Sequence, residues 1–333
     1  RGGFLGVSLF FVLSGMLMAQ VVLRDAERSE GRVAAGPYLA RRVRRLVPAS
    51  AAVTLAAVLL ALPSWSAWPG LQPGDVWAAL TGAMNWHVID LGSAQVLRGL
   101  GPLGPYWSLA VEWQFYVLLI VVCLVRVGSL RARLWSLAAV TVIGGTLLQL
   151  FGGGDGFVRE FATDRRLVEL GVGVALGLLV RHGQVPIVGP VVGRVATLVL
   201  LGLVAFVDFD PPWLLHGGFG LVAVLAAVMI ISARETGPLR RLWSSPPLVT
   251  LGRDSYSLYL VHWPVGQLLT RHLDLHPAVF VVIAVAVTLI VGVVLARAVE
   301  RPAQQLSFTP RTTLAIGVVI TLGIGLAGEL LLA

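Results

Sequence analysis

The chain lacks lysine, contains a single cysteine and is poor in charged residues. Only 13% of its 333 residues are charged, and all 25 basic residues are arginine. Soluble domains contain about one-quarter charged residues, so this composition excludes an ordinary soluble domain. Cys123 cannot form an internal disulfide or a multi-cysteine metal site. Its place within an apolar run indicates a small residue packed in the interior or against lipid.

Apolar residues dominate what remains. They make up 57% of the chain, and the mean hydropathy is +0.86. The apolar runs are continuous rather than alternating and approach about 20 residues, which is typical of helices that cross a bilayer. We therefore predict an all-α, polytopic integral membrane bundle that forms one domain over residues 1–333. About ten spans are expected, at 4–23, 46–62, 106–125, 134–151, 167–180, 195–208, 213–232, 255–271, 277–296 and 312–332.

The arginines indicate the orientation of these spans. Net charge is +8, yet the basic residues lie between apolar segments, as the positive-inside rule describes, and do not form a nucleic-acid-binding face. The richly basic loops at 24–45, 126–133, 181–194, 234–253 and 297–311 are assigned to the cytoplasm. The opposite loops contain only Arg98, Arg159, Arg165, Arg166 and Arg271. The first span then begins at the outer face with no signal peptide before it, so we expect a preceding span outside this sequence.

The long stretch 63–105 falls on the outer side in this assignment. Four of its residues, Trp65, Trp68, Trp77 and Trp86, suit an interfacial aromatic belt. Its apolar part, 76–89, has only 14 residues. We interpret it as a re-entrant or interfacial helix, because a full span there would invert every later loop.

Four arginines at 41–45 precede the second span. Guanidinium groups bind phosphate bidentately and stay charged, and Arg41 with Arg44, or Arg42 with Arg45, would share a helix face. This pattern favours a clamp for a phosphate-rich donor such as a coenzyme A thioester. Topology anchoring and contact with anionic lipid explain it equally well.

Two spans carry polar residues at helical spacing. Glu112 would lie about 9 Å inside its span, on the same face as Ser108 and Tyr116. His262 would lie about 10 Å inside another span, after Tyr259 on the same face. Such groups are costly in a bilayer and are functional candidates, although an interhelical hydrogen bond is the alternative in both cases.

The segment 163–170 begins a further span with a cluster of charges. Asp164 and Arg166 could pair locally, and Arg166 is three residues from Glu169. An exposed ion cluster of little energetic value is favoured over contact with a polar acceptor.

Six of these segments, taken together and in order, resemble the acyltransferase 3 family of polytopic membrane O-acyltransferases. "GFLGVSLFFVLSGMLM" is similar to its second-helix signature and "YLARRVRRLVPA" to its arginine-rich cytoplasmic motif. "YWSLAVEWQFYVLL", "TDRRLVELGVGVALG", "LGRDSYSLYLVHWPV" and "VERPAQQL" resemble its later motifs. The family commonly has aspartate where this chain has Ser8.

The resemblance implies acyl transfer from a cytoplasmic acyl-CoA to a hydroxyl of a cell-surface carbohydrate or a small secondary metabolite, at the membrane of a bacterial cell envelope. It implies no bound cofactor or metal, with acyl-CoA as the donor substrate. Carried over onto matching positions, the motifs give these candidates: catalytic Glu112 and His262, and substrate-binding Arg41, Arg42, Arg44, Arg45, Trp107, Tyr116, Asp164, Arg166 and Glu300. The family's main catalytic histidine belongs to its first helix, which we expect upstream of residue 1.

A membrane transporter or flippase for a lipid-linked or small anionic molecule is the alternative. It would also show about ten spans with buried charges. Paired repeats with discontinuous helices would favour it, and the sequence shows no such pairing.

Overall fold

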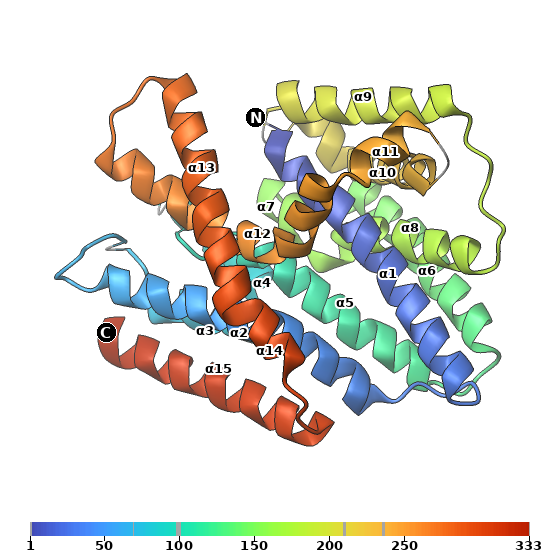
Figure 1. Cartoon of the computed structure of the whole chain (residues 1–333), viewed down its shortest axis with the longest axis horizontal. Coiled ribbons are helices and arrows are strands. Elements are labelled where there is room, and N and C mark those ends of the chain that lie inside the picture. The colour runs from blue at the N-terminus through green and yellow to red at the C-terminus, as the bar shows by residue number, and fades with distance from the viewer. Residues whose placement is uncertain (1, 69, 98–100, 209–210, 235–236, 333) are drawn as a thin grey trace. The chain divides into compact units, whose positions relative to one another are not determined.

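The described residues of the protein are helical throughout their regular elements, as the composition predicts. This computed structural model describes residues 2–68, 70–97, 101–208, 211–234 and 237–332, with the backbone alone for 93–97 (Figure 1). Arg98 of the predicted outer charge set lies outside these residues. Contacts divide the chain into two compact units, one with Val111–Leu248 and the residues up to Ala34, the other with Ala35–Ala110 and Val249–Ala333. A single domain over the whole chain stays a prediction.

The first unit is built around helix α1. It begins with a short turn, η1 (Gly2–Leu5), and takes in most of α5, which begins in the other unit. Its helices are α1 (Gly6–Arg28), α5 (Tyr106–Leu124), α6 (Leu130–Phe151), α7 (Gly156–Phe161), α8 (Thr163–Arg181), α9 (Pro190–Phe206), the π-helical turn η2 (Leu214–Gly218), α10 (Phe219–Arg234) and α11 (Pro238–Trp243).

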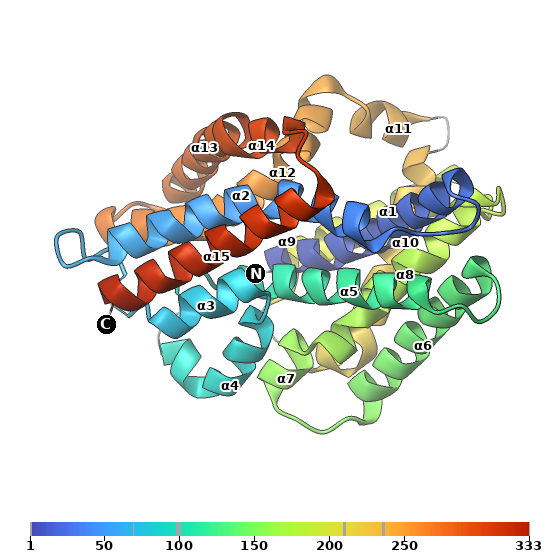
Figure 2. The ribbon, with the colours of Figure 1, turned by 90° about the horizontal axis from the view of Figure 1, so that it is seen from below.

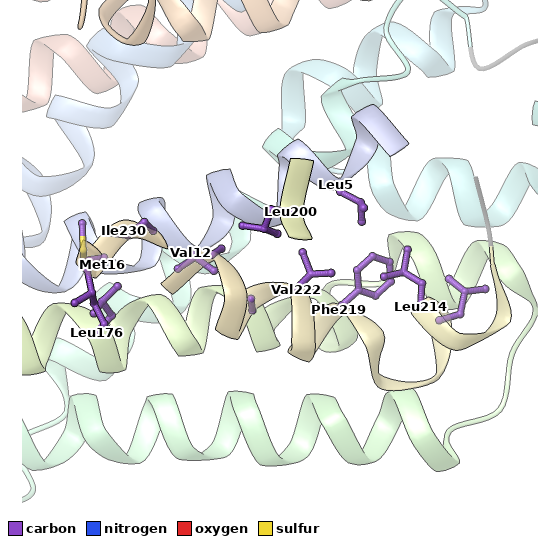
Figure 3. Close-up of a cluster of buried hydrophobic side chains, with 13 residues drawn as sticks. Leu5, Val12, Met16, Leu176, Leu200, Leu214, Phe219, Val222 and Ile230 are labelled. Carbon is purple, nitrogen blue, oxygen red and sulfur yellow. The ribbon is translucent and has the colours of Figure 1, made fainter. Parts of the chain in front are cut away.

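Close contact between α1 and α8 sets the geometry of this unit. A Cβ atom on Gly15 would lie 2.2 Å from the Leu170 carbonyl oxygen, and one on Gly173 would lie 2.2 Å from that of Val12. Small residues therefore let the two backbones meet, as in other membrane helix pairs. Around this contact, side chains from α1, α8, α9 and α10 pack into one apolar cluster, including Val12, Leu176 and Phe219 (Figure 3).

The second unit is built around α2. Its helices are α2 (Ala35–Ala61), α3 (Pro73–Thr81), α4 (Met84–Leu97), α12 (Pro246–His272, from residue 249 in this unit), α13 (Pro277–Leu295), the π-helical turn η3 (Ala296–Glu300), α14 (Arg301–Gln305) and α15 (Pro310–Leu332). Helix α15 runs along α2 and α3, as Figures 1 and 2 both show. Gly317 lies against Val43, and Gly325 lies against Trp77.

Seven of the described helices are long and apolar enough to cross a membrane. They are Gly2–Arg28, Ala35–Ala61, Tyr106–Leu124, Leu130–Phe151, Leu214–Arg234, Pro277–Gln305 and Pro310–Leu332. The predicted spans 167–180, 195–208 and 255–271 are helical but are not among the seven. Helix α9 is short at 17 residues, and neither α8 nor α12 contains a stretch of 18 residues that is both strongly apolar and poor in charge. The count of about ten spans is therefore not confirmed.

The stretch 76–89 is divided between two short helices. Helix α3 ends at Thr81, and the next residue, Gly82, has a φ of +71°, a left-handed conformation that glycine adopts readily. Helix α4 begins two residues after Gly82. The stretch is thus two short helices and not the single helix that we predicted. Its re-entrant or interfacial position stays a prediction.

Candidate active site

A buried carboxylate joins α5 to α1 in the first unit. Glu112 is 3% exposed, and its Oε1 accepts hydrogen bonds from the Ser14 hydroxyl, at 2.5 Å, and from the Tyr116 hydroxyl. Tyr116 follows Glu112 by four residues, so the predicted helical face brings these two together. The remaining member of that predicted face, Ser108, bonds instead to the Tyr259 hydroxyl at 2.6 Å. Two hydroxyl donors stabilise a carboxylate that would otherwise be costly in an apolar interior.

A buried guanidinium lies at the start of α8. Arg166 has no exposed surface, and its Nη2 lies 3.0 Å from Glu169 Oε1. Glu160 of α7 is a second carboxylate, with Oε1 3.8 Å from Nη1. The guanidinium carbon lies 3.7 Å from the ring centroid of Phe219. Arg166 is thus held by two carboxylates and an aromatic face, an arrangement suited to a planar cation.

The prediction that this cluster is exposed is wrong. We expected exposed charges at 163–170, but Arg166 and Glu169 are fully buried. The predicted pairing of Arg166 with Glu169 is confirmed. Asp164 is exposed, and the carboxylates next to the Arg166 guanidinium are those of Glu169 and Glu160. A helix turns side chains two residues apart to different faces, which explains why Asp164 and Arg166 separate.

Several buried polar contacts in this unit had no clear sequence signal. Glu160 precedes Arg166 by six residues across a break between two helices. Thr163 donates a 2.5 Å hydrogen bond to Gln114 Oε1 on α5, and Gln149 Nε2 donates to the Arg165 carbonyl at 2.8 Å. Ser14 lies within an apolar run of the sequence, and no spacing or motif indicated its hydrogen bond to Glu112.

The four clustered arginines all lie on α2, where they have different surroundings. Arg42 is 6% exposed, with its guanidinium carbon 5.4 Å from the Tyr38 ring centroid. Arg44 Nη1 donates to the carbonyls of Leu306 and Phe308, at 3.2 and 3.3 Å. Arg41 is half-buried and Arg45 is exposed. The predicted helix is therefore present, but Arg42 and Arg44 make intramolecular contacts that a donor clamp would share or displace.

The last two motifs, at 251–265 and 299–306, lie together in the second unit. Glu300 is buried, and it accepts hydrogen bonds from Ser257 at 2.6 Å and from Gln304 at 3.0 Å. Its neighbour Arg301 pairs with the buried Asp254 at 2.5 Å. These bonds tie η3 and α14 to α12. The substrate-binding role of Glu300 stays a prediction.

The two remaining candidates differ in exposure. Trp107 is 8% exposed at the start of α5. His262 is exposed, its Nδ1 lies 2.5 Å from the backbone carbonyl of Tyr259, and its ring is tilted against the Tyr259 ring at 5.2 Å. The catalytic role of His262 stays a prediction.

The candidates fall in both units of the chain. Glu112, Tyr116, Asp164 and Arg166 belong to the first unit, whereas the four arginines of α2, Trp107, His262 and Glu300 belong to the second. In the first unit the chemistry consists of a hydroxyl-bonded carboxylate and a buried guanidinium. In the second it consists of cations at one end of α2 and an imidazole on α12.

Comparison with known proteins identifies relatives of this chain. The family model described as an acyltransferase domain matches residues 1–297. The peptidoglycan O-acetyltransferase OatA of Listeria monocytogenes is 29% identical over 331 residues, covering 92% of this chain and 52% of OatA. The putative peptidoglycan O-acetyltransferase YrhL of Bacillus subtilis is 30% identical over 327 residues, covering 92% and 51%. The putative O-acetyltransferase SACOL0978 of Staphylococcus aureus is 29% identical over 282 residues, covering 79% and 46%.

The chain spans about half the length of the curated relatives that it matches. No solved structure matches it. The family model covers most of the sequence, including five of the six motif segments and six of the seven apolar helices in whole or in part. This chain is therefore a multi-pass membrane protein that belongs to the acyltransferase 3 family.

Proposed function

We propose that this chain is the membrane part of an O-acetyltransferase of the bacterial cell membrane. It moves an acetyl group from a cytoplasmic acyl-CoA to a hydroxyl of a cell-surface carbohydrate. The match to the acyltransferase domain over residues 1–297 is the observation that carries this proposal. Two relatives are named for peptidoglycan, which makes a glycan acceptor the first choice over a small secondary metabolite.

The donor binds on the cytoplasmic side, at the first turns of α2. Arg45 is exposed there and Arg41 is half-buried beside it, so both can present guanidinium groups to the phosphates of coenzyme A. Arg42 and Arg44 support this end of the helix through Tyr38 and through the loop before α15. The clamp therefore has outer cations that bind and inner cations that hold the helix in place.

The reaction is nucleophilic attack of the acceptor hydroxyl on the thioester carbonyl. A carbon–oxygen bond forms, the carbon–sulfur bond breaks, and the hydroxyl proton passes to a base and then to the leaving thiolate. A histidine is the usual base, and among the described residues of this chain His262 is the candidate. In the first unit, Glu112 orients a hydroxyl, as it already does with Ser14 and Tyr116. A substrate-binding role for Arg166 stays a prediction, because its guanidinium is fully buried beside Glu169 and Glu160.

The experiment uses membranes from cells that express the gene, incubated with radiolabelled acetyl-CoA and candidate glycan acceptors. We expect release of free coenzyme A together with label in the glycan. If several donors and acceptors give neither, the proposed function is wrong. Membership of the acyltransferase 3 family makes the transporter or flippase the less favoured alternative.

A further inference from the structure

We propose that helix α4 and its partner on α3 form a binding site for the acceptor glycan. The site consists of Trp86, His87 and Asp90, with Asp75 holding the imidazole in place. It lies in the second unit, in the stretch 63–105 that the charge pattern assigns to the outer side. This inference rests on the proposed function for its statement that the bound glycan is the acceptor.

A fixed imidazole is the centre of this site. Asp75 is 3% exposed, and its Oδ1 lies 2.8 Å from His87 Nε2. The other carboxylate oxygen, Oδ2, accepts the backbone N–H of Gln72 at 2.9 Å, which fixes the orientation of the carboxylate at the start of α3. Because Nε2 donates to Asp75, the neutral imidazole has its lone pair on Nδ1. The His87 side chain is 23% exposed, so a ligand can reach it.

The residues around His87 add the other groups that recognise a sugar. Trp86 is 45% exposed, and Asp90, which follows it by four residues on the same helix face, is also exposed. The C–H face of a pyranose stacks on an indole, and its hydroxyls donate to a carboxylate and to an imidazole nitrogen. Trp86, Asp90 and His87 provide all three partners within five residues of one short helix.

An interfacial belt does not explain this arrangement. Trp68 of the same stretch is 7% exposed, and Trp77 donates its indole N–H to Glu329 at 3.0 Å, so both are packed within the unit. Trp65, at 71% exposed, fits a belt role. A lipid anchor does not need a carboxylate buried beneath a histidine, which is costly to desolvate. Of the four tryptophans described in this stretch, Trp86 is the one that precedes the histidine of such a pair.

The test compares three variants in membranes of cells that express the gene. Trp86→Ala removes the stacking face. His87→Gln keeps a donor toward Asp75 and so preserves the contact between α3 and α4, but removes the imidazole. Trp65→Ala is the matched control, because it removes an exposed tryptophan of the same stretch that has no imidazole beside it. The acceptor is a soluble peptidoglycan tetrasaccharide, and both KM values and kcat are measured.

We expect Trp86→Ala and His87→Gln each to raise the acceptor KM by about tenfold or more, which is about 1.4 kcal/mol. Their KM for acetyl-CoA and their kcat remain close to the wild-type values, because only acceptor binding is lost. Trp65→Ala leaves the acceptor KM unchanged. If both site variants acetylate the tetrasaccharide with wild-type acceptor KM, the inference is wrong although the proposed function stands.

Calorimetric binding of the same tetrasaccharide separates the two proposals in the other direction. If the wild-type protein binds the glycan but transfers no acetyl group from any donor, the proposed function is wrong and the proposed binding site stands. In that case Trp86→Ala must still raise the calorimetric Kd for the glycan by about tenfold or more, the factor expected for the acceptor KM. Wild-type protein that acetylates other acceptors yet shows no binding of the glycan would overturn the site.

Discussion

Ser14 on α1 and Glu112 on α5 share a 2.5 Å hydrogen bond between buried side chains. The serine comes from the apolar run that opens the chain, and the carboxylate comes from a motif almost one hundred residues later. In a bilayer, such a bond is an alternative to leaving a polar group unsatisfied in hydrocarbon. This contact gives the small polar residue of α1 a defined partner and fixes the carboxylate for its proposed role.

A double-mutant cycle measures this relationship. We expect Ser14→Ala and Glu112→Leu each to lower the stability of the purified protein. The first removes one donor to the buried carboxylate, and the second leaves the buried Ser14 hydroxyl without its acceptor. The two together should lose less than their sum, by a coupling energy of about 1–2 kcal/mol. Unfolding in detergent with increasing denaturant provides the four stabilities. Strict additivity would show that the hydroxyl and the carboxylate do not interact.

The pair Arg166 and Asp164 provides a second prediction, because the family motif contains both while the structure separates them. Removing the buried guanidinium by Arg166→Gln leaves Glu169 and Glu160 without their cation, so we expect a loss of about 3–5 kcal/mol. Asp164→Asn changes an exposed side chain and should alter stability by less than about 0.5 kcal/mol. Thermal unfolding and the amount of protein in the membrane report both effects. A destabilised Asp164→Asn would contradict this arrangement.

The sequence was sufficient for contacts that follow helical spacing. Glu112 with Tyr116 and Arg166 with Glu169 lie four and three residues apart, and one helix brings each pair together. The all-helical class followed from continuous apolar runs, because a bilayer restricts backbone to structures that satisfy their own hydrogen bonds.

Tertiary contacts had no comparable signal. The ring of Phe219 covers Arg166 from a helix more than fifty residues later, and Glu160 approaches from a separate short helix. Neither position has a spacing that links it to Arg166. The burial of Arg166 and Glu169 was not predicted for the same reason. The hydropathy of α8 shows that the helix contains charged residues, but it does not show the partners from other helices that make their burial possible.

Close packing of α1 on α8 leads to a third prediction. Gly15→Ala would place a methyl group 2.2 Å from the Leu170 carbonyl oxygen, whereas Gly6→Ala on the same helix meets nothing within 4 Å. The first change must push two backbones apart and should cost about 1–3 kcal/mol. The second change should be neutral or slightly stabilising, because alanine has a higher helix propensity than glycine. Melting temperatures in one detergent compare the two, and equal values would mean that the helices do not meet at Gly15.

The neighbouring residues Arg44 and Arg45 provide the fourth prediction, which separates binding from support within the donor clamp. Arg45 is exposed, so Arg45→Gln should raise the KM for acetyl-CoA by about tenfold, or about 1.4 kcal/mol, by removing one charge-assisted contact with phosphate. Its melting temperature should not change. Arg44→Gln removes the donor to the carbonyls of Leu306 and Phe308. Unlike Arg45→Gln, it should therefore lower the free energy of unfolding, by about 1–3 kcal/mol.

Arg311→Gln is the control for charge alone, because Arg311 is an exposed arginine at the start of α15, outside the cluster. It should leave both KM and stability at wild-type values. A general attraction between a basic surface and an anionic donor would instead reduce affinity equally in the Arg45 and Arg311 variants, and it would weaken with salt in both. A change confined to Arg45→Gln supports a defined phosphate contact, since a bidentate guanidinium bond depends on the position of the residue and not on the net charge of the face.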